Sequence, residues 1–276
     1  MPEKSTKQTL LTLLSDFGIS DEYVAVMKGV IAQINPMLRV VDITHKIPPQ
    51  NITAGRFCLM NAIRYFPLGS VHVAVVDPVV GGKRRAVAVE FAQGFLVAPD
   101  NGLISGVLSQ NTVIAAVELT NPDYWYTPQP STTFHGRDIF APVGAHLANG
   151  ISLQELGPEI NPKSLVRLDL PESTQKDDVI MGCIQYIDHF GNLVTNIPQN
   201  YVQGQNWCVE IKGKKIKAQE TYSDVKVGEV TALIGSHGWV EIAVNCSNAC
   251  LELDVKLGDA VLISSSKKLG LNDLRI

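Results

Sequence analysis

The chain has 276 residues, of which 45% are hydrophobic and 18% charged, and its formal net charge is −4 at pH 7. This composition is ordinary for a globular protein, and the length fits one large domain or two. The basic residues are scattered, which argues against nucleic acid or an anionic membrane surface as the main partner. No apolar run reaches the roughly 18 residues needed to span a bilayer.

Predicted strands and helices alternate through the first half of the chain. Ser20 is predicted to cap the first helix, with Asp21 and Glu22 in its first turn, and Asn51 to cap the second. The alternation predicts right-handed crossovers and an α/β domain with a largely parallel sheet. Strands are predicted at residues 10–14, 38–43, 71–76, 85–90, 95–98 and 112–117, and helices at 21–34, 51–65, 103–108 and 137–150.

The composition changes after residue 165. Residues 170–178, LPESTQKDD, are polar, contain a proline and form the best linker candidate. Beyond them helical periodicity disappears, and short apolar runs at 179–187, 207–211, 229–234, 239–244 and 260–264 are separated by Gly, Asn and Asp. This pattern predicts a small antiparallel sandwich or barrel. We expect an α/β domain over 8–168 and a smaller, all-β, barrel-like domain over 178–276.

The cysteine pattern and the start of the chain indicate a reducing compartment. The five cysteines are an odd number without a CxxC pair, so reduced thiols are expected. The first residues, MPEKSTKQT, are polar and lack the apolar core of a signal peptide, so we expect a cytoplasmic protein. Cys246 and Cys250 lie four residues apart, which leaves a zinc pair open. No second ligand pair follows, and no metal is expected.

Charged side chains flank the turn after the most apolar predicted strand. Asp77 ends that strand and Arg84 opens the next, and the turn between them contains Gly81 and Gly82. In open α/β sheets, ligands bind in the crevice at the strand ends. The pair is therefore either part of a binding site or a structural ion pair that closes the turn, and the residues alone leave both interpretations open.

Other polar residues also follow apolar runs. Asp16, Thr44 and Asp100 do so, and a carboxylate near a helix N-terminus can accept the two hydroxyls of a ribose. Asp16 is a candidate for that contact, and the alternative is that it only caps its turn. His135 follows Phe134 just before a predicted helix, an exposed position for a ring that can relay protons. The other histidines are interpreted as structural.

Several site types are excluded or left open by motif. The chain has no GxGxxG, no GxxxxGK[ST] and no GxSxG, so a conventional dinucleotide site, a triphosphate cradle and an α/β-hydrolase serine are unsupported. A metal-dependent nucleotide phosphatase stays open, with Asp16, Asp100 and Asn101 as ligands. Arg84 beside Asp77 would oppose a cation there.

Seven segments, in order along nearly the whole chain, carry a family resemblance. They are LLSDFGISDEYVAVMKG, DITHKIPPQNI, VVDPVVGGKRR, APDNGLIS, TFHGRDIFAP, IDHFGNLVTNI and SHGWVEIAVN. Together they resemble the S-adenosylmethionine hydroxide adenosyltransferases, hydrolase relatives of the halide-using fluorinase and chlorinase enzymes. The resemblance implies hydrolysis of S-adenosylmethionine to adenosine and methionine without a cofactor. It also implies homotrimers in which each site lies between the N-terminal domain of one subunit and the C-terminal domain of the next.

The resemblance also implies roles for individual residues. Asp77, Arg84 and His135 match the catalytic set, in which Asp77 would orient the water and Arg84 would fix its carboxylate. Whether the proton of the water passes on to His135 stays open. The implied substrate contacts are Asp16 with the ribose hydroxyls, Phe134 beside the ribose, Asp21 and Asp188 with the methionine ammonium, Ser236 with the carboxylate, and Phe190 and Asn192 with adenine.

Two departures from the family pattern affect these expectations. Val79 stands where the family usually has Gly, which puts the turn after Asp77 in question, and His237 stands where the halide enzymes have Arg. The halide enzymes also replace the acid by Tyr, so Asp77 and His135 favour water as the nucleophile. A non-catalytic protein that binds S-adenosylmethionine or adenosine as a sensor or store remains an alternative.

Overall fold

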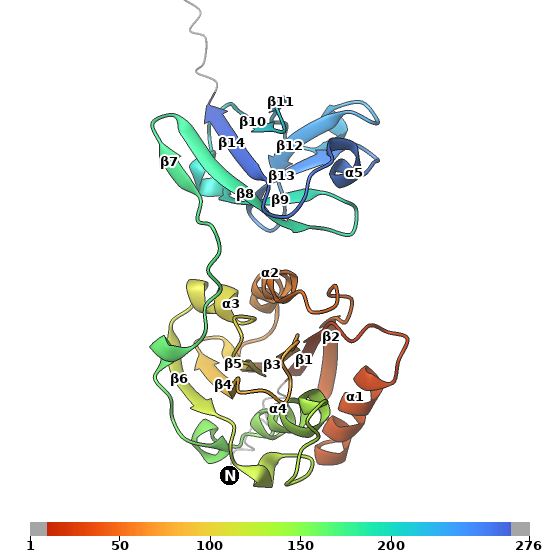
Figure 1. Cartoon of the computed structure of the whole chain (residues 1–276), viewed down its shortest axis with the longest axis vertical. Helices are drawn as coiled ribbons and strands as arrows, with labels where there is room; N and C mark the ends of the chain where they lie inside the picture. The colour runs from red at the N-terminus through yellow and green to blue at the C-terminus, as the bar shows by residue number, and fades with distance from the viewer. Residues whose placement is uncertain (1–9, 266–276) are drawn as a thin grey trace, which may run out of the picture. The chain divides into compact units, whose positions relative to one another are not determined.

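The structure, a computed structural model, describes residues 10–265 and divides the chain into two units (Figure 1). The boundary lies between Leu168 and Asp169. The sequence predicts domains over 8–168 and 178–276, and the outermost residues of these ranges lie outside the described part. Among the described residues, no helix is long and apolar enough to cross a membrane.

A six-stranded sheet forms the centre of the first unit. Its spatial order is β2-β1-β3-β5-β4-β6, and β2, β1, β3 and β5 pair in parallel. Strand β4 is antiparallel to both of its neighbours, so the sheet is mostly parallel, as predicted, with one reversed strand. The strands are β1 Leu10–Ser15, β2 Arg39–Thr44, β3 Ser70–Val75, β4 Ala86–Phe91, β5 Gly94–Pro99 and β6 Val113–Glu118.

Helices cover both faces of this sheet, α1 and α4 on one side and α2 and α3 on the other (Figure 1). They are α1 Tyr23–Ile34, α2 Ile52–Ala62, α3 Ser105–Gln110 and α4 Ala141–Ala148. Every residue of β3 is buried, as expected for a central strand covered on both faces. At Gly144 the backbone of α4 approaches β3 so closely that a Cβ would lie 2.4 Å from a Val73 methyl group. Asn51 caps α2 as predicted, because its side chain accepts the backbone N–H of Ala54 at 2.9 Å.

The start of α1 differs from the prediction. The helix begins at Tyr23, after Asp21, and its N-cap residue, Glu22, makes no capping hydrogen bond through its side chain, so Ser20 is not the cap. The preceding loop is held elsewhere: Gly18 has a left-handed φ of +73° and donates its N–H to the carbonyl of His45 at 2.8 Å. The chain therefore turns into the helix two residues later than its acidic residues suggest.

The predicted helix at 137–150 is composite. It opens with a π-helical turn, Gly136–Phe140, and continues as α4. Pro142 has no N–H to donate into the preceding turn, and the carbonyl of Asp138 instead accepts the backbone N–H of Tyr126 at 2.9 Å. A proline in the first turn thus reshapes the helix beside His135.

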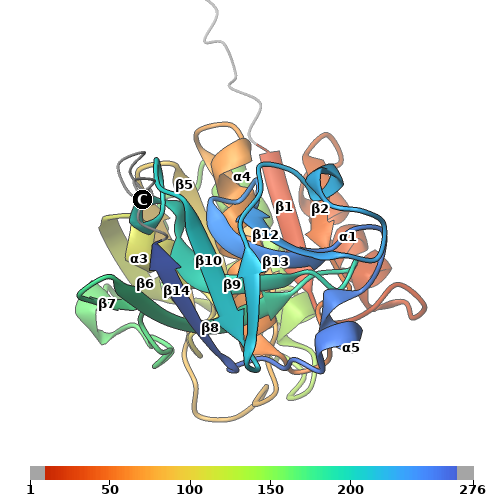
Figure 2. The ribbon, with the colours of Figure 1, turned by 90° about the horizontal axis from the view of Figure 1, so that it is seen from above.

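The second unit is an antiparallel sheet of order β11-β10-β14-β8-β9-β13-β12. The short strand β7 pairs with β8 in addition to this order. A bridge from Ala218 to Ala232 links the two ends of the sheet, which makes it a nearly closed, barrel-like sheet as predicted. Figure 2 shows β10, β14, β8 and β9 side by side. The elements are β7 Thr174–Lys176, β8 Val179–Ile187, β9 Leu193–Pro198, β10 Trp207–Ile211, β11 Lys214–Lys217, β12 Val230–Ile234, β13 Trp239–Val244, α5 Ala249–Leu253 and β14 Ala260–Ser265.

Three of these elements differ from the sequence prediction. The proposed linker at 170–178 contains β7, which pairs with β8, so it is partly sheet. Strands β9 and β11 are not predicted, because β9 carries Asn and Thr between its apolar residues and β11 reads Lys-Lys-Ile-Lys. Pairing with neighbouring strands outweighs these weak local signals.

Candidate active site

Polar residues of the first unit gather at one edge of its sheet. Strands β1, β2 and β3 end there, and Asp16, Thr44 and Asp77 stand at or just beyond their ends. Because β4 is reversed, Arg84, which precedes it, arrives at the same edge. This edge is where open α/β sheets bind ligands.

Asp77 and Arg84 form a buried ion pair. Arg84 Nε donates to Asp77 Oδ2 at 2.9 Å, and Nη2 donates to the same oxygen. The two side chains are only 4% and 7% exposed. Asp77 Oδ1 is also buried and has no hydrogen-bond partner among the described residues. An unpaired buried carboxylate oxygen is costly, and the hydrogen of a water molecule or of a hydroxyl group would satisfy it.

Arg84 also contacts His135. Its Nη2 lies 2.7 Å from His135 Nδ1, and because a guanidinium only donates, Nδ1 is the unprotonated nitrogen and Nε2 carries the proton. Burial lowers the pKa of His135, the Arg84 cation lowers it further, and the carboxylates of Asp77 and Asp138 oppose these effects. His135 is therefore neutral near pH 7, and the structure brings together all three residues of the predicted catalytic set.

The turn after Asp77 packs against the loop that precedes His135. Gly81 has a left-handed φ of +75°, and a Cβ there would lie 2.2 Å from the carbonyl oxygen of Thr132. Val79, by contrast, is 52% exposed and does not have a positive φ. The valine that departs from the family pattern therefore fits the turn without backbone strain.

Aromatic rings surround Phe134. Its ring centroid lies 5.7 Å from that of Phe17 and 5.2 Å from that of Tyr23, and the Arg137 guanidinium lies 5.4 Å from it. Arg137 Nε in turn donates to the fully buried Asp138 at 2.6 Å. The loop before α4 is thus held by edge-to-face contacts between aromatic rings and by a buried carboxylate. These contacts are not predicted from the sequence.

Asp16 is held by a distant part of the chain. Its Oδ2 accepts the backbone N–H of Gln50 at 2.7 Å, and Gln50 has a left-handed φ of 65°. The side chain of Asp16 is half-buried. The contact joins the loop after β1 to the loop after β2, so Asp16 does more than cap its own turn. Asp21 is exposed in the loop that leads to α1.

The residues proposed for a metal-dependent phosphatase are engaged in other contacts. Arg85 Nε donates to Asp100 Oδ2 at 2.9 Å, and Asn101 Nδ2 donates to the carbonyl of Val76 at 2.8 Å. Cys250 directs its thiol to the carbonyl of Val255, 3.3 Å away. Within residues 10–265, no three His, Cys, Asp or Glu side chains are grouped so that they could hold a metal ion.

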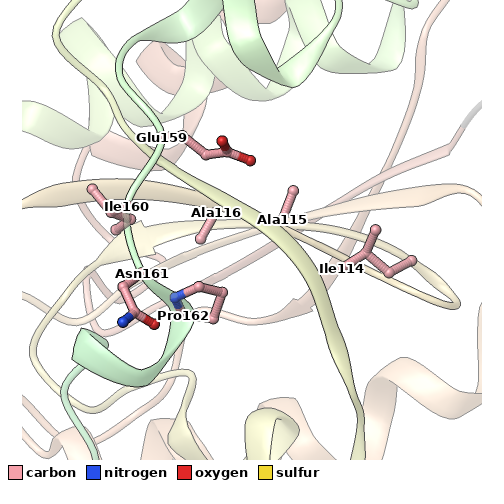
Figure 3. A pocket seen from close by; sticks show the side chains of 7 residues that line it. All are labelled: Ile114, Ala115, Ala116, Glu159, Ile160, Asn161 and Pro162. Carbon is pink, nitrogen blue, oxygen red and sulfur yellow. The ribbon is translucent and has the colours of Figure 1, made fainter.

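A surface pocket of about 360 Å³ lies elsewhere, along the edge strand β6 (Figure 3). It is lined by Ile114, Ala115, Ala116, Glu159, Ile160, Asn161 and Pro162. None of these residues belongs to the Asp77 site. Its polar side chains are Glu159 and Asn161, and the Asn161 amide oxygen already accepts the backbone N–H of Lys163 at 3.0 Å. We place the candidate site at the strand ends, where several charged side chains meet.

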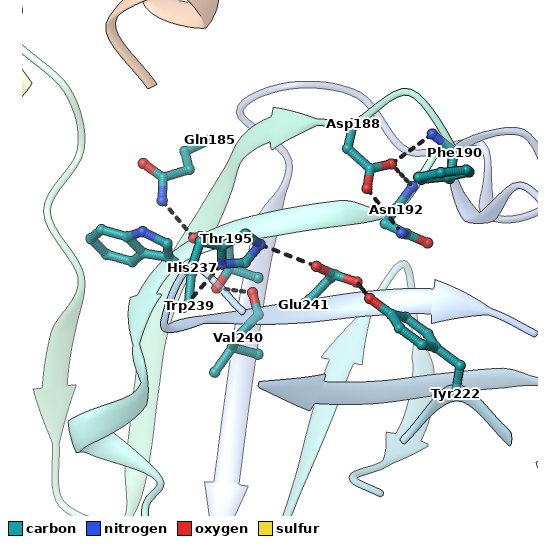
Figure 4. Close-up of polar contacts among 10 residues, drawn as sticks. All are labelled: Gln185, Asp188, Phe190, Asn192, Thr195, Tyr222, His237, Trp239, Val240 and Glu241. Carbon is teal, nitrogen blue, oxygen red and sulfur yellow. Dashed lines mark hydrogen bonds and ion pairs between the residues drawn. The ribbon is translucent and has the colours of Figure 1, made fainter. Parts of the chain in front are cut away.

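The candidate residues of the second unit lie near the β8–β9 turn and before β13 (Figure 4). Asp188 accepts the backbone N–H groups of Phe190 and Asn192, at 2.9 and 2.8 Å, and the Asn192 side-chain amide at 2.9 Å. These bonds close the turn and leave the Phe190 ring 71% exposed, whereas Asn192 is buried. Ser236 is exposed in the loop between β12 and β13.

His237 is held within its own unit (Figure 4). Its Nδ1 accepts the backbone N–H of Trp239 at 3.2 Å, and its Nε2 lies 3.1 Å from Glu241 Oε2. Glu241 is 3% exposed, and its other oxygen accepts the hydroxyl of Tyr222 at 2.7 Å. With Nδ1 accepting, only Nε2 of His237 can donate, whereas an arginine offers five N–H donors. Neither Glu241 nor Tyr222 is predicted from the sequence, since no motif spacing links them.

A cluster of charged side chains at the strand ends of an open α/β sheet stands where such folds bind small-molecule ligands. Family models described as the SAM hydroxide adenosyltransferase N-terminal and C-terminal domains match residues 11–157 and 182–262. The chain therefore belongs to the SAM hydroxide adenosyltransferase family.

Individual relatives agree with this assignment. An "(R)-S-adenosyl-L-methionine hydrolase" of Salinispora tropica is 39% identical over 92% of this chain and 97% of its own length. A "Fluorinase" of Nocardia brasiliensis is 27% identical over 95% of this chain and 99% of its own. An uncharacterized conserved protein of Thermotoga maritima has a similar crystal structure, with a TM-score of 0.87 and 35% identity, over 92% of this chain and all of its own.

Proposed function

We propose that this chain hydrolyses S-adenosyl-L-methionine to adenosine and L-methionine through attack of water on ribose C5′. Four relatives that are 35–39% identical over about nine tenths of the chain are curated as (R)-S-adenosyl-L-methionine hydrolases. The observation that carries the proposal is the buried carboxylate of Asp77, with Oδ2 held by Arg84 and Oδ1 unpartnered among the described residues. That oxygen is suited to accept a hydrogen bond from the attacking water.

The sulfonium substrate sets what the site must supply. As the water oxygen forms its bond to C5′, the electrons of the C5′–S bond pass to sulfur, and methionine leaves as a neutral thioether without a general acid. The oxygen becomes strongly acidic as its bond to carbon forms, so a carboxylate is a sufficient base. Asp77 Oδ1 takes the proton and releases it to solvent. Holding the water in line with the C–S bond lowers the barrier by several kcal/mol.

Arg84 and His135 position this carboxylate. The guanidinium fixes Asp77 Oδ2 and also donates to His135 Nδ1, so that nitrogen cannot take up the proton of the water. His135 keeps its proton on Nε2 and acts as a donor. We therefore assign proton acceptance to Asp77 and orientation to His135.

The substrate contacts are proposed from the resemblance and from the placement of each residue. Asp16 holds the ribose hydroxyls, Asp21 and Asp188 the methionine ammonium, and Ser236 the carboxylate. Phe134 packs beside the ribose, and Phe190 and Asn192 contact adenine, with the exposed Phe190 ring available for stacking. We propose a cytoplasmic homotrimer whose sites combine the first unit of one subunit with the second unit of the next.

Halide use is the second candidate, because relatives named fluorinase are 27–28% identical to this chain. The carboxylate of Asp77 opposes it, since a second anion beside a buried anion is unfavourable. Water remains the better nucleophile for this site.

The test is to incubate chelator-treated protein with S-adenosylmethionine in water labelled with heavy oxygen and to measure adenosine by mass spectrometry. Wild type should place the label in adenosine, and Asp77→Asn should not. Asp100→Asn is the matched control, because Asp100 is also a buried carboxylate paired with an arginine, Arg85, and it should retain turnover per folded molecule.

The other outcomes identify the alternatives. Binding of S-adenosylmethionine without any product would support the non-catalytic protein. Activity that disappears with chelator would support the metal-dependent enzyme, and a 5′-chloro product formed in chloride would support halide use.

A further inference from the structure

Two buried histidines of the first unit contact hydroxyl groups on β1. His72 Nδ1 lies 2.8 Å from the hydroxyl of Thr12, in the middle of the sheet. His45 Nδ1 lies 2.7 Å from the hydroxyl of Ser15, at the edge where the strands end. They are 1% and 5% exposed. Only the second pair adjoins Asp16, and the proposed function uses neither.

The Ser15–His45 pair extends to a carboxylate. His45 Nε2 lies 3.2 Å from Asp42 Oδ1, close enough for electrostatic attraction although the N–H is not aligned for a hydrogen bond. Asp42 in turn accepts from Lys28 at 2.7 Å. The carboxylate favours the proton on Nε2, so Nδ1 is left to accept from Ser15. The order Ser–His–Asp is that of a nucleophilic relay, but Ser15 is fully buried and cannot reach a substrate.

The same histidine ties two loops together. Its carbonyl accepts the backbone N–H of Gly18 at 2.8 Å, while its ring holds Ser15, so it clamps the loop that contains Asp16 on both sides. Ser15 Oγ also accepts the N–H of Phe17 at 3.3 Å. The Gln50 N–H then meets Asp16 Oδ2 from the loop after β2.

We infer that His45, acting through Ser15, is a positioning residue that sets the orientation of the Asp16 carboxylate. The inference rests on the proposed contact between Asp16 and the ribose hydroxyls. A carboxylate that accepts two neighbouring hydroxyls must present both oxygens in one plane, and a small rotation loses one of the two bonds. The contacts of His45 with Ser15 and Gly18, together with the Gln50 N–H, fix that plane.

The test measures discrimination between adenosine and 2′,3′-dideoxyadenosine, which lacks the ribose hydroxyls, by calorimetric titration. Wild type should prefer adenosine. His45→Leu should lose about tenfold of that preference, the equivalent of one good hydrogen bond, and should raise the KM for S-adenosylmethionine more than it lowers kcat. His45→Asn should restore much of the preference for adenosine and much of the KM. The amide oxygen of the introduced asparagine can accept from the Ser15 hydroxyl at the position of Nδ1.

His72→Leu is the matched control for stability. It removes an equally buried histidine that also contacts a β1 hydroxyl, so it should lower stability but keep the preference for adenosine. Ser15→Ala is the milder variant if His45→Leu does not fold, and it should reduce the preference in the same way.

A double-mutant cycle tests separately the contact of Asp16 with the ribose and the positioning role of His45. If His45 acts through Asp16, the effects of His45→Leu and Asp16→Ala on the preference for adenosine should not add. If Asp16→Ala leaves the preference unchanged, the proposed ribose contact is wrong. If Asp16→Ala abolishes it while the His45 and Ser15 variants keep it, the ribose contact stands and the positioning role is overturned.

Discussion

Arg84 Nη2 donates to Nδ1 of His135 across 2.7 Å, so the guanidinium determines which nitrogen of the imidazole carries the proton. Arg84 Nη2 also donates to Asp77 Oδ2. A cation therefore stands between the acid and the histidine, whereas in a serine-hydrolase triad the histidine contacts the carboxylate directly. The arrangement suits a reaction that needs an oriented water and no acid for the leaving group.

Replacement of Arg84 by lysine should keep the positive charge but lose the geometry of the contacts with Asp77 and His135. A lysine ammonium lacks the planar fork that meets Asp77 with two N–H groups and His135 with one. We expect kcat to fall by roughly 10²-fold, the value of lost hydrogen bonds to charged groups, with a smaller change in KM. Arg85→Lys, at the neighbouring arginine, is the control. Equal losses of kcat in the two variants would contradict the assignment.

Activity should fall on the acid side of neutrality. Burial and the Arg84 cation lower the pKa of His135 below its ordinary value of 6.5, and protonation of Nδ1 would break its bond to Arg84. We expect kcat to stay constant as the pH falls to about 6.5, the ordinary pKa of histidine. At lower pH, kcat should decline as the pH approaches the lowered pKa of His135. A pH–rate profile checks this prediction, and a rate that rises with acidity would refute it.

Stability should change with pH in the same direction. Between the lowered folded-state pKa of His135 and 6.5, the unfolded chain binds more protons, so stability falls as the pH drops through that window. Burial lowers the pKa of His72 to about 4, which contributes with the same sign. Urea unfolding at about pH 7.5 and about pH 5.5 should therefore show a smaller loss for His135→Asn than for wild type. An unchanged loss would mean that His135 does not contribute.

Gly81→Ala should damage both stability and catalysis. The left-handed φ costs about 1–2 kcal/mol for any L-residue, and the new Cβ would also collide with Thr132. Gly69→Ala is the control, because Gly69 has a φ of +85° but no atom within 4 Å of the added Cβ. We expect the larger loss of unfolding free energy at Gly81, together with a lower kcat. Similar behaviour in the two variants would show that the packing of the turn is unimportant.

Glu241→Gln should affect recognition of the methionine part of the substrate alone. One carboxylate oxygen of Glu241 contacts His237, which is next to Ser236, and the other accepts from the Tyr222 hydroxyl. The substitution therefore removes the charge of the acceptor that holds the loop of Ser236. We expect about a tenfold rise in the KM for S-adenosylmethionine with adenosine affinity unchanged. Glu210→Gln, at an exposed position on β10, is the control. A parallel loss of adenosine affinity would place Glu241 in general stability instead.

The sequence predicts the two fold classes correctly because apolar periodicity is strong. The buried run of β3 and the Asn51 cap are local signals, and the structure contains both. The late start of α1 and the π-helical turn at Gly136–Phe140 depend on a distant carbonyl and on a proline, which local pattern does not weigh. Strand β7 forms only because β8 lies beside it.

The same contrast holds for the site. Asp16 and Asp77 are visible in sequence because they follow apolar strands. The contacts of Ser15 with His45 and of Tyr222 with Glu241 join residues 30 and 19 positions apart, so spacing gives no hint of them. The protonation state of His135 also requires the position of Arg84. The individual substrate contacts stay predictions.

The reversal of β4 has a consequence for how this reaction can diversify. Because β4 starts at the edge where β3 ends, Asp77 and Arg84 both belong to the one connection between these strands. In the proposed mechanism, the carboxylate that contacts the attacking water and the guanidinium that holds this carboxylate therefore lie in one short loop. If that mechanism holds, substitutions confined to this loop would change which nucleophile is used without altering the sheet that supports it.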